Sequence, residues 1–122
     1  MKIALNTLQL LVCFTFVLPA YSQETTVVPD SVWKTPKNVI IYGKEQAKQN
    51  RLDVVKEIEA DYKFGSLSTE AKYNFYDQVQ LGLGQSGNTI DCINYMKKCI
   101  SFAIENNRED LLYHSNGDNF TY

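Results

Sequence analysis

The sequence predicts an all-α fold made of stacked antiparallel helix hairpins. Apolar residues recur at helical spacing in several segments, helix-capping residues precede these segments, and short turn sequences join them. Short connections between antiparallel helices produce αα-hairpins. Residues 39–42, Val-Ile-Ile-Tyr, are β-branched or aromatic and are compatible with a short buried strand as well as a helix.

The first predicted hairpin joins a helix over residues 36–49 to a helix over 52–63. Thr35 is suited to the N-cap of the first helix and Pro36 to its first position. Asn and Arg at positions 50–51 form the predicted turn. The second helix carries an apolar stripe at spacings of three, three and four residues, which consists of Leu52, Val55, Ile58 and Tyr62.

The second predicted hairpin follows a turn at Phe-Gly-Ser, residues 64–66. Ser68 caps its first helix, residues 85–88 form a tight connection, and Asn88 caps its second helix over 89–106. The stripes expected to face the core are Tyr73, Tyr76, Val79 and Leu83 in the first helix, and Ile93, Met96, Ile100 and Ala103 in the second. Residues 108–114 are compatible with the start of a fifth helix.

Residues 1–22 have the pattern of a cleavable signal peptide. A positive residue at the second position precedes an apolar run over residues 3–18, and small residues occupy the −3 and −1 positions of a cut after Ser22. The apolar run is shorter than the roughly 20 residues of a membrane span, and Pro19 interrupts it. We expect an exported protein, periplasmic or secreted, whose mature chain starts at Gln23 and has no membrane span.

The mature chain has the length of one small domain. Residues 23–35 are predicted to form an extended linker, 36–114 the helical-hairpin domain, and 115–122 a flexible, Gly- and Asn-containing tail. Loss of Lys2 changes the net charge from −2 to −3. This weak negative charge is spread along the chain and provides no basic surface for nucleic acid.

Residues 82–87 match the pattern G-x-G-x-x-G, which binds dinucleotides when it follows a strand and opens a helix. Here the preceding residues have a helical period, so nucleotide binding is not predicted. The only histidine, His114, lies beside the predicted tail, and no nucleophile–base set is visible. The sequence therefore predicts neither an enzyme nor a cofactor.

Two cysteines remain after the predicted cleavage, Cys92 and Cys99, seven residues apart on one helix. That spacing corresponds to about 10.5 Å along a helix, whereas a disulfide needs Cα atoms within about 7 Å. The pair also lacks the companion ligands of a metal site. We expect both cysteines to be packing residues on the flank of the predicted core stripe.

Residues 73–104 resemble a tetratricopeptide repeat, a pair of antiparallel helices of about 34 residues. With Gly87 as the turn glycine of that family, the remaining core positions align without gaps; they are Tyr76, Val79, Leu83, Cys92, Met96 and Cys99. The upstream helix pair fits the same pattern more loosely. The resemblance implies a fragment of an α-solenoid with about two repeats, either complete in itself or the N-terminal part of a longer array.

The resemblance further implies a non-catalytic protein–protein interaction module. In that family the first helix of a repeat contacts a peptide or a partner domain, and Asn74, Asp77 and Gln78 match those outward positions. Self-association is an open possibility, because fewer than three repeats leave an apolar face without a partner. The alternative is a small secreted helical protein that binds an apolar ligand or acts in oligomeric assembly.

Overall fold

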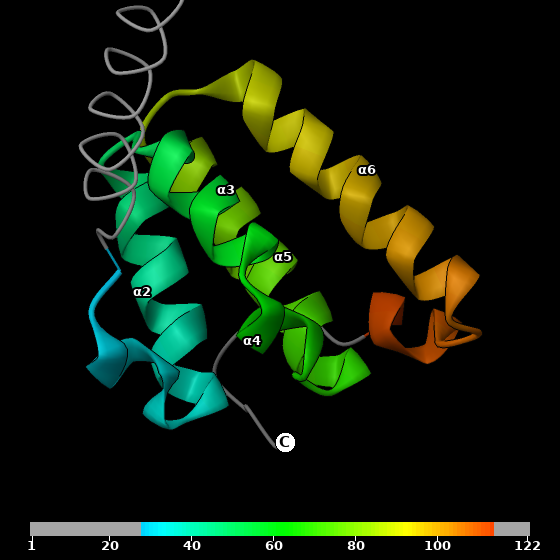
Figure 1. Cartoon of the computed structure of the whole chain (residues 1–122). Coiled ribbons are helices and arrows are strands. Elements are labelled where there is room, and N and C mark those ends of the chain that lie inside the picture. Colours follow the sequence, from blue (N-terminus) through cyan, green and yellow to red (C-terminus); the bar gives the residue numbers. More distant parts are fainter. Residues whose placement is uncertain (1–27, 114–122) are drawn as a thin grey trace, which may run out of the picture.

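The computed structural model describes residues 28–113 and is built of helices in that range (Figure 1). The all-α prediction is confirmed, and residues 39–42 lie within a helix. The predicted signal peptide, the predicted linker up to residue 27 and the predicted tail lie outside the described residues.

Two antiparallel hairpins make up the described chain. The first contains α2 (Pro36–Lys48) and α3 (Leu52–Ala60), and the second contains α5 (Thr69–Gln85) and α6 (Thr89–Glu105). A short helix, α4 (Tyr62–Gly65), connects them, and 3-10 helices η1 (Asp30–Lys34) and η2 (Glu109–Tyr113) flank them. The hairpins pack mainly through their first helices, α2 and α5.

All three predicted N-caps are confirmed. The Thr35 and Ser68 hydroxyls accept hydrogen bonds of 3.1 Å from backbone N–H groups in the first turns of α2 and α5. The Asn88 side chain accepts one of 3.2 Å in the first turn of α6. Each cap satisfies a backbone donor that the helix itself leaves unpaired, so these three boundaries follow from local sequence.

The two hairpin turns are built alike. Asn50 and Gly87 each adopt a left-handed backbone, with φ of 57° and 83°, and the residue after each donates back into the last turn of the preceding helix. This left-handed closure is typical of helix C-termini and favours glycine or asparagine. The Asn88 amide also donates to the Asn50 side chain at 2.8 Å, which fastens one hairpin turn to the other.

Glycines allow α2 and α5 to approach closely. Gly43 lies directly against the ring of Phe75, where a Cβ atom would clash. A Cβ atom on Gly82 would lie 2.7 Å from the Lys44 carbonyl oxygen and 2.8 Å from Cβ of Ala47. Because Gly43 faces Phe75 and Ala47 faces Gly82, the two helices run in the same direction. The first glycine of the G-x-G-x-x-G pattern thus serves helix packing.

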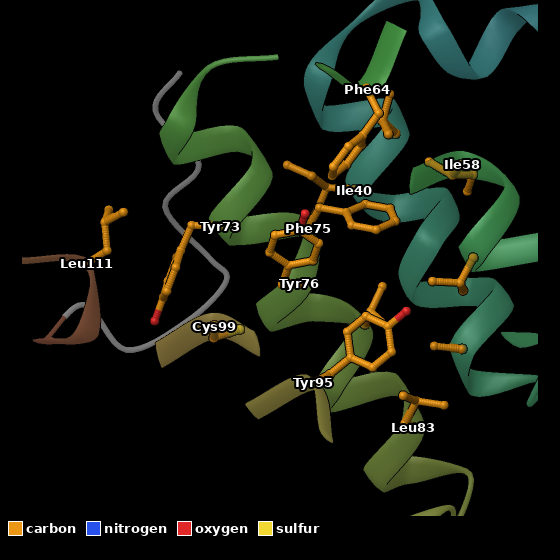
Figure 2. Close-up of a cluster of buried hydrophobic side chains, with 14 of the residues drawn as sticks. Ile40, Ile58, Phe64, Tyr73, Phe75, Tyr76, Leu83, Tyr95, Cys99 and Leu111 are labelled. Atoms are coloured by element: carbon orange, nitrogen blue, oxygen red, sulfur yellow. The ribbon is translucent and has the colours of Figure 1, made fainter. Parts of the chain in front are cut away.

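Aromatic side chains fill the centre of the core. Phe64, Phe75 and Tyr76 point toward one another in Figure 2, with ring centroids 4.9 Å apart for the first two and 5.8 Å for Phe64 with Tyr76. Phe102 of α6 adds an edge contact to Tyr76 at 5.4 Å. The predicted core stripe of α5 is confirmed, since Tyr73, Tyr76, Val79 and Leu83 are all buried.

The second predicted helix breaks earlier than expected. Asp61 has an extended backbone, and its carboxylate accepts from the Lys63 N–H at 2.9 Å, which starts the separate helix α4. The break changes which side chain faces inward: Tyr62, predicted as core, is 80% exposed, whereas Phe64, predicted as part of a turn, is buried. An Asp cap in the middle of the apolar pattern therefore redirected the chain.

The predicted linker and the predicted fifth helix also need correction. Residues 30–34 form a 3-10 helix whose Val32 is buried and whose Trp33 packs against the core, so that this part is neither extended nor a linker. At the other end, η2 is a single short 3-10 helix that anchors Leu111 in the core. The two 3-10 helices that flank the hairpins, η1 and η2, thus both cover apolar surface of the core.

Candidate functional site

The three residues predicted to bind a partner lie on α5 but differ in exposure. Asn74 and Asp77 are half-buried, whereas Gln78 is only 3% exposed. Gln78 lies about one helical turn from both Phe75 and Gly82, which pack on α2, so the expectation that it points outward is wrong. The side chains of Asn74 and Asp77 therefore remain partly accessible to a ligand.

Burial dominates the electrostatics of this α5 surface. It raises the pKa of Asp77, an effect that the Gln78 amide and the Lys44 charge partly offset. The buried Gln78 Nε2 group acts on this carboxyl but makes no hydrogen bond of regular geometry within the described residues, so its burial is only partly compensated. Together these side chains offer a partner one half-buried carboxyl and one half-buried amide, which is a small polar surface.

A polar cluster joins α3 to α6. The Tyr95 hydroxyl donates to Glu59 Oε2 at 2.5 Å, and Lys98 forms an ion pair with the other oxygen of the same carboxylate. The Lys98 ammonium also lies 4.8 Å from the centre of the Tyr76 ring. Because the members of this cluster satisfy one another, it fixes α6 against α3, and we assign it a structural role.

Three core tyrosines should make the protein sensitive to alkali. Burial raises the pKa of Tyr73 and of Tyr76 from 10.0 to about 12. Burial and the Glu59 carboxylate raise the pKa of Tyr95 as well. Above pH 10 the unfolded chain releases these protons while the folded chain keeps them, so their contribution to stability is complete below pH 10 and declines above it.

We expect the free energy of unfolding to fall by about 1–2 kcal/mol for each of these tyrosines between about pH 9 and pH 11.5. Urea denaturation followed by circular dichroism at several pH values measures this fall. The Tyr76→Phe variant removes one titrating group and should show a shallower decline. A decline as steep as in the parent chain would contradict the assignment of Tyr76.

Helix α6 carries apolar side chains on two faces. The face toward α5 consists of small or aromatic residues, Cys92, Tyr95, Cys99, Phe102 and Ala103, all buried or partly buried. The other face exposes Ile90 at 76%, Ile93 at 45%, Met96 at 44%, Ile100 at 48% and Ile104 at 52%. We call these five exposed residues the outer seam.

The predicted core face of α6 is therefore wrong for Ile93, Met96 and Ile100, and correct for Ala103. The reason lies in the contacts of the opposite face of α6, where Phe102 packs on the Tyr76 ring and the Tyr95 hydroxyl donates to Glu59. These contacts turn the face with Cys92, Cys99 and Ala103 inward as well, and the isoleucine face is left outside. Helical spacing alone does not distinguish these two faces of α6, because both carry apolar residues at intervals of three or four.

The outer seam follows the length of α6. Its members are spaced by three, three, four and four residues, which places them on one side of the helix. In Figure 1, α6 runs along one edge of the helical array, and it packs mainly against α5 and η2. The seam is thus a continuous row of aliphatic side chains on the outside of the described protein.

A second surface feature is a shallow groove between η1 and α2. It has a volume of about 280 Å³, and its lining residues are Ser31, Val32, Asn38, Ile41, Tyr42 and Glu45. The Asn38 amide donates to the Ser31 backbone oxygen across it at 3.4 Å. The lining mixes polar and apolar groups, and the groove is open to solvent.

Cys92 and Cys99 are free thiols, as the helical spacing predicted. Burial raises the pKa of Cys99 to about 12, which makes its thiol a poor nucleophile at neutral pH. Within residues 28–113 no three His, Cys, Asp or Glu side chains lie close enough together to hold a metal ion. None of the helices in the same range is long and apolar enough to cross a bilayer.

Comparison with protein-family models, curated proteins and solved structures found no match for this chain. The resemblance to a tetratricopeptide repeat therefore stays a prediction that rests on residues 73–104. On the surface of the described residues, α6 carries five of the nine exposed large hydrophobic side chains, all of them in the outer seam.

Proposed function

We propose that this chain is an exported, non-catalytic protein–protein interaction module of tetratricopeptide-like helical hairpins. The observation that carries the proposal is the outer seam, in which five large aliphatic side chains stand in a row on one helix. Isolated exposed apolar residues are common on proteins, whereas contiguous apolar surface of this kind typically marks an interaction site.

The setting of the seam suits a binding role. Helix α6 is attached to the rest of the fold by the Glu59–Tyr95–Lys98 cluster on one flank and by the aromatic core beneath it. A partner that docks there meets side chains already fixed on a helix, which reduces the entropy lost on binding. Aliphatic side chains offer contact area and no reacting group, so the chemistry of the seam supports binding and not catalysis.

The half-buried side chains of Asn74 and Asp77 on α5 form a second, smaller contact in this proposal. They lie on the first helix of the second hairpin, where the family resemblance predicts partner contacts. In a longer array, a further hairpin of the same chain would stack against the outer seam. That contact would be apolar, as the contact with a separate partner is in this proposal.

Export is the second part of the proposal, and it rests on the leader-like residues 1–22. We expect an expression host that secretes the chain to remove them, so that mass spectrometry of the secreted product finds Gln23 as the first residue. A product that retains Met1 and stays with the cells would contradict the export proposal.

Site-specific photocrosslinking tests the binding surface directly. A photoreactive residue is placed at position 100 on the seam in cells that naturally produce the chain, and at position 62 of α4 as a control that is 80% exposed. We expect a discrete crosslinked species from position 100 and none from position 62. Combining the probe at position 100 with Ile93→Glu should abolish the species.

Crosslinks of equal yield from both positions would overturn the proposed surface, as would the absence of any adduct at position 100. An adduct that survives Ile93→Glu unchanged would do the same, because a partner seated on the seam has to contact the neighbouring turn of α6.

A further inference from the structure

We infer that the partner of the outer seam is a second copy of this chain, paired antiparallel about a two-fold axis that crosses α6 near residue 98. This inference rests on the proposed function, because it identifies the partner of the same surface. Three properties of the described residues support it: the spacing of the seam, its apolar area and its charge.

The spacing of the seam suits pairing with itself. From Ile93 the apolar positions advance by three, four and four residues, close to the alternation that lets two helices interlock along a seam. With the axis near residue 98, Met96 of one copy lies against Ile100 of the other, and Ile93 lies beside Ile104. A two-fold interface uses the same patch twice, so a single uninterrupted row is sufficient.

The apolar area of the seam matches the lower limit of a specific dimer. With roughly 120 Å² for each fully exposed side chain of this size, the observed exposures of 44–76% correspond to on the order of 300 Å² per copy. Interfaces are about 57% apolar. The apolar area contributed by both copies therefore implies a total buried area of about 1,000–1,100 Å². Specific interfaces begin near 1,000 Å², which predicts a weak, reversible dimer.

The charge distribution permits close approach of two copies. None of the five seam residues carries a charge, and the charged residues interleaved among them are Asp91, Lys97 and Lys98, of which Lys98 is paired with Glu59. Residues 28–113 contain eleven lysines and arginines against twelve aspartates and glutamates, so long-range repulsion between copies is small. A seam bordered by charges of one sign would instead have favoured a partner of opposite charge.

Sedimentation velocity over a concentration series tests the pairing, with the secreted chain as the sample. We expect the weight-average sedimentation coefficient to rise from the monomer toward the dimer value in the micromolar to submillimolar range. Ile100→Glu should raise the dissociation constant at least ~30-fold, because each dimer would bury two carboxylates in an aliphatic interface. Circular dichroism verifies that the variant keeps its helix content.

Ile41→Glu is the matched control, because Ile41 is 46% exposed against 48% for Ile100 and lies on α2. It should leave the dissociation constant within about twofold of the parent value. A strong effect of Ile41→Glu with none from Ile100→Glu would overturn the assigned interface.

Failure of this inference can be distinguished from failure of the proposed function. A chain that stays monomeric at all concentrations, but crosslinks from position 100 to one different protein, refutes self-pairing and leaves the interaction module intact. A monomeric chain without any crosslink from position 100 refutes both. A crosslink from position 100 to a second copy, together with the effect of Ile100→Glu, supports both.

Discussion

Replacing Phe75 with alanine is expected to lower the free energy of unfolding by about 3–5 kcal/mol. The Phe75 side chain is fully buried, contacts the rings of Phe64 and Tyr76, and covers Gly43 of α2. Its removal leaves a cavity where α2, α4 and α5 meet, and none of these helices can move in without losing its other contacts. Small domains are stable by only about 5–15 kcal/mol, so the loss is a large fraction of the total.

Urea denaturation measures this effect, and Tyr62→Ala is the control. Tyr62 is also aromatic and also close to the connection between the hairpins, but it is largely exposed. We expect its replacement to change the free energy of unfolding by no more than about 0.5 kcal/mol. Similar losses for both variants would contradict the description of α4, in which Phe64 and not Tyr62 faces the core.

Replacing Gly82 with alanine is expected to cost about 2–3 kcal/mol of stability. The new Cβ atom would meet the Lys44 carbonyl oxygen at 2.7 Å and Cβ of Ala47 at 2.8 Å. Both belong to the body of α2 and cannot rotate away, so α2 and α5 would have to separate along their whole crossing. The contacts of Phe75 with α2 would loosen at the same time.

Gly84→Ala provides a matched control two residues away. There the new Cβ atom would lie 3.5 Å from the Cys92 sulfur, an ordinary van der Waals distance. The usual preference of helices for alanine over glycine should then raise stability by about 0.5–1 kcal/mol. Thermal or urea unfolding of the two variants should therefore shift in opposite directions, and a shift in the same direction would contradict the proposed packing of α5.

Features set by neighbouring residues could be predicted from the sequence. The caps at Thr35, Ser68 and Asn88 are fixed by a side chain and a backbone donor within three residues of each other. The turns at Asn50 and Gly87 need a residue that tolerates a left-handed backbone. These local requirements placed both hairpins and most boundaries of their four helices, and the exception is the end of α3 at Ala60, which was predicted near residue 63.

Features set by contacts between helices were harder to predict. Ile93, Met96 and Ile100 of the outer seam were predicted to face the core together with Ala103, because their helical spacing fits an apolar stripe when only one helix is considered. The contacts of Tyr95 with Glu59 and of Phe102 with Tyr76 instead turn the face with Cys99 and Ala103 toward the core. Gln78 was expected outside because the family resemblance placed it at an outward position, whereas it is buried on α5 between Phe75 and Gly82, which pack on α2.

Methyl-detected NMR of the isoleucine side chains tests the central claim, that the outer seam is the surface through which this protein binds. Between residues 28 and 113 the isoleucines are Ile90, Ile93, Ile100 and Ile104 on the seam, Ile40 and Ile58 in the core, and Ile41 exposed on α2. Spectra recorded from dilute to concentrated samples, and with any crosslinked partner added, should show shifts or broadening in the four seam methyls while Ile41 stays unchanged. Shifts at Ile41 with unchanged seam methyls would contradict the account.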